Sequence, residues 1–155
     1  KTNEPIPASL VKGMKAAQSL GSGIETEGQM WLGMMDQAYH TAPKGEIDTT
    51  KTCWDIFEQV MPYKRFPSAF SQASFGHLNG YQGAYYGYLW SLVYAQDMFG
   101  RFEEKGVLSE EAGKYYRDKV LGRGGTMDEL DMLRDYLGRE PNMAAFMRRL
   151  GLSGN

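Results

Sequence analysis

The sequence has few of the residues that hold metals or cross-link a fold. Its 155 residues include one cysteine, Cys53, and two histidines. A single cysteine excludes a disulfide framework and a zinc ribbon, because both need several thiols. The same scarcity favours an intracellular setting. We expect the cytoplasm, with an organelle lumen or matrix as the alternative.

A surplus of basic charge and long apolar runs are also lacking. The 17 Lys and Arg residues face 19 Asp and Glu residues, a net charge of −2, whereas a binder of phosphate backbones is normally basic. Nothing approaches the roughly 18 uninterrupted apolar residues of a membrane span. We therefore expect neither nucleic acid nor a membrane as a partner. We expect no signal peptide, and Lys1 in first place indicates a processed chain or a piece of a longer one.

Strand patterns are missing as well. No stretch alternates between apolar and polar residues, and apolar residues instead recur at intervals of three and four, the period of a helix. Together with a length typical of one domain, this predicts an all-α, multi-helical fold. The predicted helices cover about residues 8–20, 24–41, 49–61, 83–104, 109–122, 126–137 and 141–150.

Side chains that can cap helices precede several of these segments. Thr49 or Thr50 can cap the third predicted helix, and Ser109 can cap the fifth. Thr126 and Glu129 have the spacing of a capping box before the sixth. Each would accept or exchange hydrogen bonds with the unpaired N–H groups of a first helical turn.

Glycine and tyrosine are abundant, with 19 and 10 residues, and both concentrate between Phe75 and Trp90. If a helix starts near residue 82, then Tyr81, Tyr85 and Tyr88 share one of its faces. Composition alone favours an aromatic helix packed in a core. The glycines favour a second interpretation, a row of ligand-facing hydroxyl groups beside a mobile loop, because a core helix disfavours glycine.

A row of phenols suggests a specific chemistry. A tyrosine hydroxyl, with a pKa near 10, is a neutral hydrogen-bond donor at pH 7. Aimed at a developing oxyanion in a dry site, one such donor can be worth on the order of 10²–10³ in rate.

The Gly/Tyr-rich segment also carries a family resemblance. The segments FGHL at 75–78, GY at 80–81 and YYGYLWS at 85–91 resemble the C-terminal region of the thimet oligopeptidase family of zinc metallopeptidases. The resemblance keeps its order and spacing over essentially the whole chain. Further segments that resemble the family are EPIP at 4–7, Asp36-Gln37 with His40, DMF at 97–99, GG at 124–125, LGREP at 137–141 and GL at 151–152.

The resemblance implies a two-lobed, zincin-type peptidase that cuts short peptides in a channel, with residues 1–155 as a C-terminal helical segment of its catalytic domain. The family holds zinc on a His-Glu-x-x-His helix whose Glu is the general base. That motif is absent here, since neither His40 nor His77 is followed by Glu. We expect an N-terminal zinc-bearing part, in the same or a separate chain, as a partner. The isolated chain is expected to bind no zinc and to be inactive.

The resemblance also implies roles for residues of the Gly-rich loop, about residues 76–87. It implies that this loop closes over a short peptide substrate and that Tyr88 and Tyr85 donate to the scissile carbonyl oxyanion, Tyr88 being the stronger candidate. His77 would bond the substrate backbone. The remaining implied substrate-binding residues are Tyr81, Gly76, Gly80 and Gly83.

Several alternatives stay beside these expectations. The whole chain could be a non-catalytic helical peptide-binding or interaction module derived from the same fold. Asp36 and His40 have the i,i+4 spacing of a metal pair, but two ligands are too few, which favours a simple Asp–His hydrogen bond. Cys53 is interpreted as a packed residue rather than a nucleophile, and Asp97 as a carboxylate paired inside the protein with an Arg.

Overall fold

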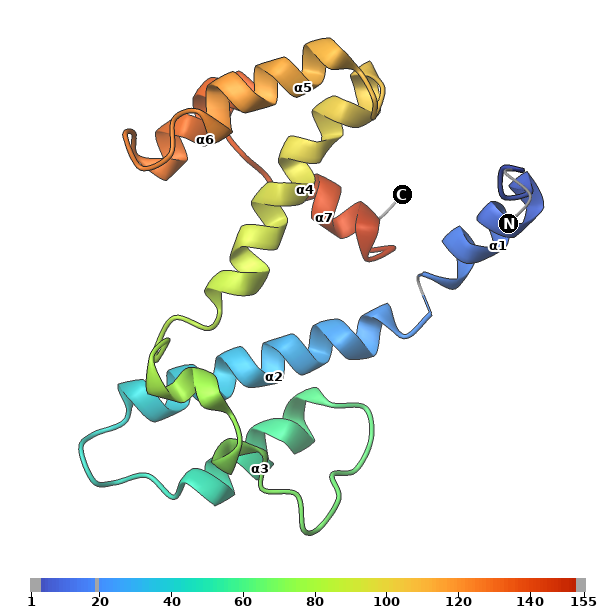
Figure 1. Ribbon diagram of the computed structural model, residues 1–155. Coiled ribbons are helices and arrows are strands. Elements are labelled where there is room, and N and C mark those ends of the chain that lie inside the picture. The colour runs from blue at the N-terminus through green and yellow to red at the C-terminus, as the bar shows by residue number, and fades with distance from the viewer. Residues whose placement is uncertain (1–3, 19, 153–155) are drawn as a thin grey trace. The chain divides into compact units, whose positions relative to one another are not determined.

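The computed structural model describes residues 4–18 and 20–152, and every regular element in these ranges is helical (Figure 1). The all-α prediction is therefore confirmed. The α-helices are α1 (Ala8–Ala17), α2 (Ser22–Thr41), α3 (Thr49–Val60), α4 (Gly87–Lys105), α5 (Glu110–Tyr116), α6 (Glu129–Leu137) and α7 (Ala144–Arg149). Shorter elements are the 3₁₀ turns η1 (Ser71–Ala73) and η2 (Gly76–Asn79) and the π-helical turn η3 (Arg117–Leu121).

The chain divides into two compact units, residues 1–87 and 88–155. None of the helices in the described residues combines the length and the apolar character that crossing a membrane requires. Each unit has its own small core, and each core contains one buried aspartate.

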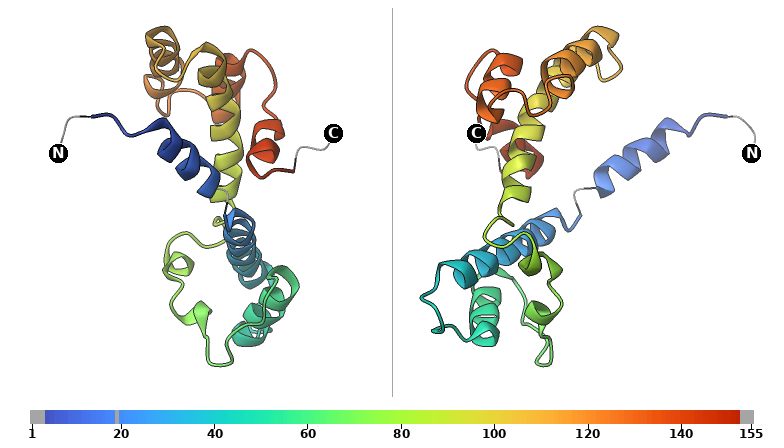
Figure 2. Two further views of the ribbon diagram at one scale, coloured as in Figure 1. Left: turned by 90° about the vertical axis from the view of Figure 1, so that its right-hand side faces the viewer. Right: turned by 60° about the vertical axis from the view of Figure 1, so that its left-hand side comes forward.

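In the first unit, α3 packs along α2, as Figures 1 and 2 show. The Trp31 indole N–H donates to the carbonyl of Cys53 at 3.2 Å, and its ring meets Phe57 edge-on with centroids 5.1 Å apart. Met35 and Cys53 are fully buried between the two helices. This packing holds α2 in place as the support for the loop described below.

The ends of α3 differ slightly from the predicted ones. Asp48, rather than Thr49 or Thr50, caps the helix by accepting the N–H of Lys51 at 2.9 Å. The helix ends at Val60, and Met61 is extended, as expected for a residue that precedes a proline.

The second unit is built around Tyr136, whose side chain is completely buried. Its hydroxyl donates to the carbonyl of Met98 at 3.3 Å, and the rings of Tyr115 and Tyr116 pack against it. The Arg101 guanidinium lies 3.8 Å from the ring centroid of Tyr115. Three of the tyrosines outside the Gly-rich loop therefore belong to this core.

Asp97 joins α4 to the segment before α7. Its buried carboxylate accepts two hydrogen bonds from Arg139, at 2.8 and 2.5 Å, and one from the Asn142 N–H at 2.9 Å. The predicted Asp–Arg pair is thus confirmed. Burial raises the pKa of Asp97, but the hydrogen bonds from Arg139 and Asn142 and the charge of Arg139 outweigh it, so this pKa lies below its ordinary value.

The N-terminal ends of three helices in the second unit can also be compared with the predicted ones. Ser109 caps α5 as predicted, accepting the N–H of Ala112 at 3.2 Å. The capping box at Thr126 was a wrong prediction, because Asp128 caps α6 instead. The last helix begins at Ala144 rather than at Pro141, since the Asn142 side chain accepts the N–H of Ala144.

We expect Asp97→Asn to lower the free energy of unfolding of the second unit by about 1–3 kcal/mol at pH 7, because Arg139 loses its charged partner. Because the pKa of Asp97 is lower in the folded than in the unfolded state, its carboxylate stabilises the fold fully above the unfolded pKa of about 3.9. This stabilisation is lost as the pH falls through the pKa of the folded state. The difference between wild type and variant should therefore shrink below about pH 4. Urea denaturation over a pH series measures it, and equal stabilities at pH 7 would contradict the assignment.

Candidate functional site

The Gly-rich loop is not the start of a helix. Helix α4 begins at Gly87, so Tyr81 and Tyr85 do not share a helical face with Tyr88, and that prediction was wrong. Helix α4 starts late both because of the local backbone conformation and because of a contact with another helix. Gly83 has a φ of 71°, in the left-handed region that an α-helix cannot include, and its N–H bonds to a side chain of α2.

That side chain is Asp36, which is 1% exposed. One carboxylate oxygen accepts the N–H of Gly83 at 2.9 Å, and the other accepts the N–H of Tyr85 at 3.0 Å. The predicted Asp–His hydrogen bond is present, but it joins His40 Nδ1 to the backbone carbonyl oxygen of Asp36, at 2.8 Å, and the same nitrogen lies 2.9 Å from the first carboxylate oxygen. Gln37 adds a further tie by donating to the carbonyl of Gly83 at 2.7 Å. We call Asp36 and Gln37, with their bonds to Gly83 and Tyr85, the loop clamp.

Tyr85 lies directly on the loop clamp, and its side chain is 7% exposed. Its hydroxyl donates to Oε1 of Gln29 at 3.0 Å. Its ring meets Phe75 and His77 edge-on, with centroids 4.9 and 5.1 Å away. The backbone and the phenol of Tyr85 are therefore both held by α2.

A hollow of about 600 Å³ opens beside this ring. It brings together five of the predicted site residues: Gly76, His77, Gly80, Tyr81 and Tyr85. The other residues that line it are Ser74, Phe75 and Asn79. Of the two remaining predicted residues, Gly83 belongs to the loop clamp, and Tyr88 lies on the first turn of α4 with a 48% exposed side chain. Imidazole, phenol and exposed backbone groups can together hydrogen-bond an extended polar ligand.

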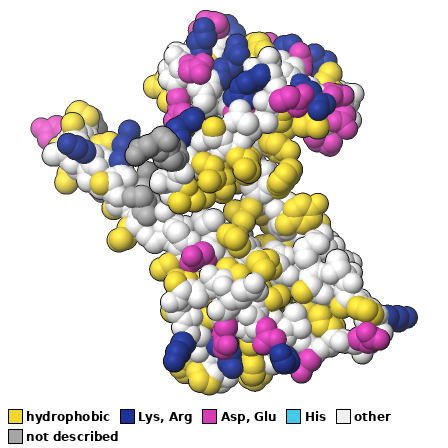
Figure 3. All heavy atoms as spheres, turned by 180° about the vertical axis from the view of Figure 1, so that it is seen from behind, with side chains coloured by type: hydrophobic (Ala, Val, Ile, Leu, Met, Phe, Trp, Pro, Cys, Tyr) yellow, Lys and Arg dark blue, Asp and Glu magenta, His cyan; other side chains and the backbone are white. Residues whose placement is uncertain are grey.

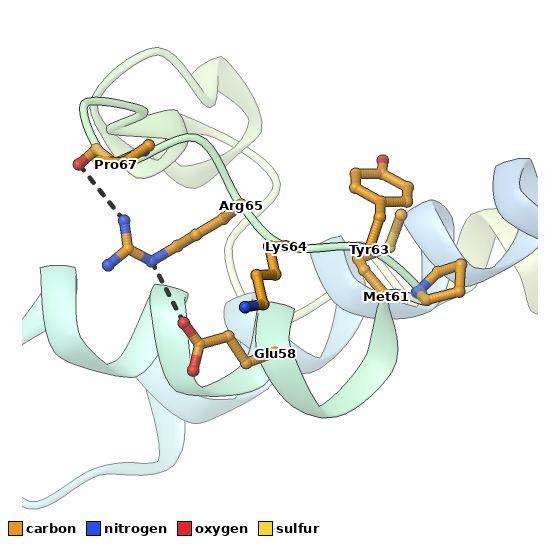
Figure 4. Close-up of a pocket in the computed structure, with 7 residues that line it drawn as sticks. Glu58, Met61, Tyr63, Lys64, Arg65 and Pro67 are labelled. Carbon is orange, nitrogen blue, oxygen red and sulfur yellow. Dashed lines mark hydrogen bonds and ion pairs between the residues drawn. The ribbon is translucent and has the colours of Figure 1, made fainter.

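A second pocket lies where the chain leaves α3 (Figure 4). The Arg65 guanidinium covers the ring of Trp54 at 3.6 Å and faces Glu58, with Nε 3.6 Å from the carboxylate. Arg65 also donates to the carbonyl of Pro67 at 3.3 Å. These contacts attach residues 62–67 to α3, and we interpret this pocket as structural.

Comparisons with known proteins identify the family of the chain. Residues 1–152 match the sequence pattern of peptidase family M3. The chain belongs to peptidase family M3. It is 33% identical to oligopeptidase A of Salmonella typhimurium, over 99% of this chain and 23% of that protein. It is 35% identical to saccharolysin of Saccharomyces cerevisiae, over 98% of this chain and 22% of that protein.

A third relative is the thimet-like oligopeptidase of Dictyostelium discoideum, 32% identical over 97% of this chain. This M3 chain spans only 22–23% of the length of these three relatives. The expected resemblance is therefore confirmed at the level of the family.

The side chains that the structure of this M3 chain describes do not fit a zinc site. Such a site needs three or four protein ligands, and residues 4–18 and 20–152 contain no group of three or more His, Cys, Asp or Glu side chains that could hold a metal ion. Of this candidate pair, Asp36 accepts hydrogen bonds from the loop, and His40 Nδ1 lies within hydrogen-bond distance of the Asp36 carbonyl.

Sequence reasoning missed the loop contacts of Gln29, Asp36 and Gln37. A signal was present, because residues 29, 33, 36 and 40 lie on one face of α2. Gly33 belongs to the same face, and a side chain there would meet the backbone of Tyr86, since a Cβ at position 33 would lie 3.6 Å from the Tyr86 Cα. A polar stripe that contains a glycine thus marks where the loop crosses α2.

We expect Cys53 to be unreactive in the native state of this M3 chain. The thiol is buried, and burial is the main cause that raises its pKa. A thiol reagent such as Ellman's should therefore label Cys53 slowly without denaturant and fully in urea. Rapid stoichiometric labelling of the native protein would contradict the packed assignment and revive a nucleophilic role.

Proposed function

We propose that this chain is the substrate-side, C-terminal portion of a zinc-dependent metallopeptidase that hydrolyses short peptides. Membership of family M3 supports the peptidase class. The observation that carries the more specific proposal is the hollow beside the Gly-rich loop, where His77, Tyr81 and Tyr85 come together. A peptide backbone offers the donors and acceptors that these side chains complement.

The residues have distinct proposed roles. His77 and Tyr81 bind the peptide, and the small residues Gly76 and Gly80 allow it to approach the loop backbone closely. Tyr88 donates to the carbonyl oxygen as it becomes an oxyanion, and its exposed side chain suits this role. Tyr85 is the second donor, and to act it would exchange its bond to Gln29 for one to the substrate.

Zinc and the general base come, in this proposal, from an N-terminal part of the enzyme. Zinc supplies an activated water when it is bound. Exposed apolar side chains support such a partner, because α1 buries none of its residues and Leu10 and Met14 are 60% and 61% exposed. Figure 3 shows further hydrophobic side chains on the molecular surface. Surfaces of this kind mark contacts with another protein segment.

We expect Tyr88→Phe, in the complete enzyme, to lower kcat by roughly 10²–10³ with a much smaller change in KM. The phenol would stabilise the oxyanion, a charge that develops only in the transition state. Tyr86→Phe is the matched control, since Tyr86 is also exposed and carries no proposed role. Steady-state kinetics on a short peptide decide the matter, and a raised KM with unchanged kcat would argue against an oxyanion donor.

We expect the purified 155-residue chain to cleave no short peptide and to bind no stoichiometric zinc, and addition of the zinc-bearing part to restore hydrolysis. Metal analysis and a fluorogenic peptide assay measure both. Hydrolysis by the chain alone would contradict the proposal that zinc and the general base come from another part of the enzyme. Peptide binding that is never followed by cleavage, with the zinc-bearing part present, would favour the alternative of a non-catalytic binding module.

A further inference from the structure

The Gly-rich loop consists of two parts with different surroundings. Residues 79–82 are exposed, whereas Gly83 and Ala84 are half-buried and Tyr85 is buried. The backbone N–H groups of Leu78 and Tyr81 bond to carbonyls three and four positions earlier, within the loop itself. The N–H groups of Gly83 and Tyr85 instead bond to α2, some 47 and 49 positions away.

The bond to α2 is made by an anion. A carboxylate that accepts backbone N–H groups forms charge-assisted hydrogen bonds, which are stronger than those between neutral groups. Asp36 is 1% exposed, so breaking these bonds would leave a buried charge with fewer donors. At Gly83 the loop clamp binds both backbone groups. The N–H of Gly83 donates to Asp36, and its carbonyl accepts from Gln37.

From this we propose that Asp36 is a positioning residue for the peptidase reaction. It fixes the base of the Gly-rich loop at residues 83–85, so that the loop closure that the family resemblance implies is confined to an arm at residues 76–82. The base fixes the backbone of Tyr85 beside the hollow, while the arm carries His77 and Tyr81 to the ligand. This inference rests on the proposed function, because it names a peptide as the ligand.

Hydrogen exchange in the complete enzyme tests the division directly. Binding of a non-hydrolysable short peptide should slow amide exchange in residues 76–82 and leave the Gly83 and Tyr85 amides, already protected, unchanged. In Asp36→Asn, the amide nitrogen of Asn replaces one acceptor, so at least one of these two amides should exchange about tenfold or more faster. The expected kcat falls about 10- to 100-fold with a smaller change in KM.

Asp97→Asn is the matched control. Asp97 is likewise buried and accepts a backbone N–H, but it serves the core of the second unit. Its variant should lower thermal stability while exchange at Gly83 and Tyr85 and kcat stay at wild-type values. If Asp36→Asn does not fold, Gln37→Met removes the bond to the Gly83 carbonyl and should still speed exchange at the Gly83 amide several-fold.

Unchanged exchange at Gly83 and Tyr85 in both α2 variants would overturn the proposal, as would equal effects of Asp97→Asn on the loop. Peptide-induced changes at residues 83–85 as large as those in the arm would overturn it too. An enzyme that shows the expected exchange pattern in Asp36→Asn but no peptidase activity in the wild type would contradict the proposed function instead.

Discussion

The geometry of the candidate site depends on one buried carboxylate. Asp36 lies in the C-terminal half of α2 and accepts hydrogen bonds from two backbone N–H groups of a loop that follows almost fifty residues later. A buried charge is stable only when donors surround it. The loop supplies those donors, and the same hydrogen bonds fix the path of the loop across α2. The turn at Gly83, the buried ring of Tyr85 and the late start of α4 all accompany this contact.

The same contact explains where sequence reasoning succeeded and failed. Helical periodicity predicted α2 and α3 well, because their apolar positions pack against each other and the pattern reports that packing. It failed between residues 83 and 86. Tyr81, Tyr85 and Tyr88 keep a spacing of four and three, but a left-handed glycine at position 83 and its bond to a distant helix override this local pattern. Periodicity carries no information about a partner some fifty residues away.

The site residues show a related limit. The family resemblance predicted that His77, Tyr81 and Tyr85 act together, and the structure places all three around one hollow. It drew no attention to Gln29 or to the contacts of Asp36, because motif matching looks for residues that could face a ligand. Gln29 and Asp36 instead contact the Gly-rich loop itself and hold Tyr85 in place. The sequence signal for these residues was the polar face of α2, which appears only when positions three and four apart are grouped on one side of the helix.

The two buried aspartates show how one residue type serves two ends. Asp97 is held by the guanidinium of Arg139, so opposite charges compensate each other within the second unit. Asp36 is held by the backbone N–H groups of Gly83 and Tyr85, which every residue except proline would supply at these positions. A clamp made from backbone N–H groups constrains the path of the chain rather than the identity of its side chains. If Asp36 fixes the base of the loop, as we propose, the side chains of the arm can change without altering the path of the base.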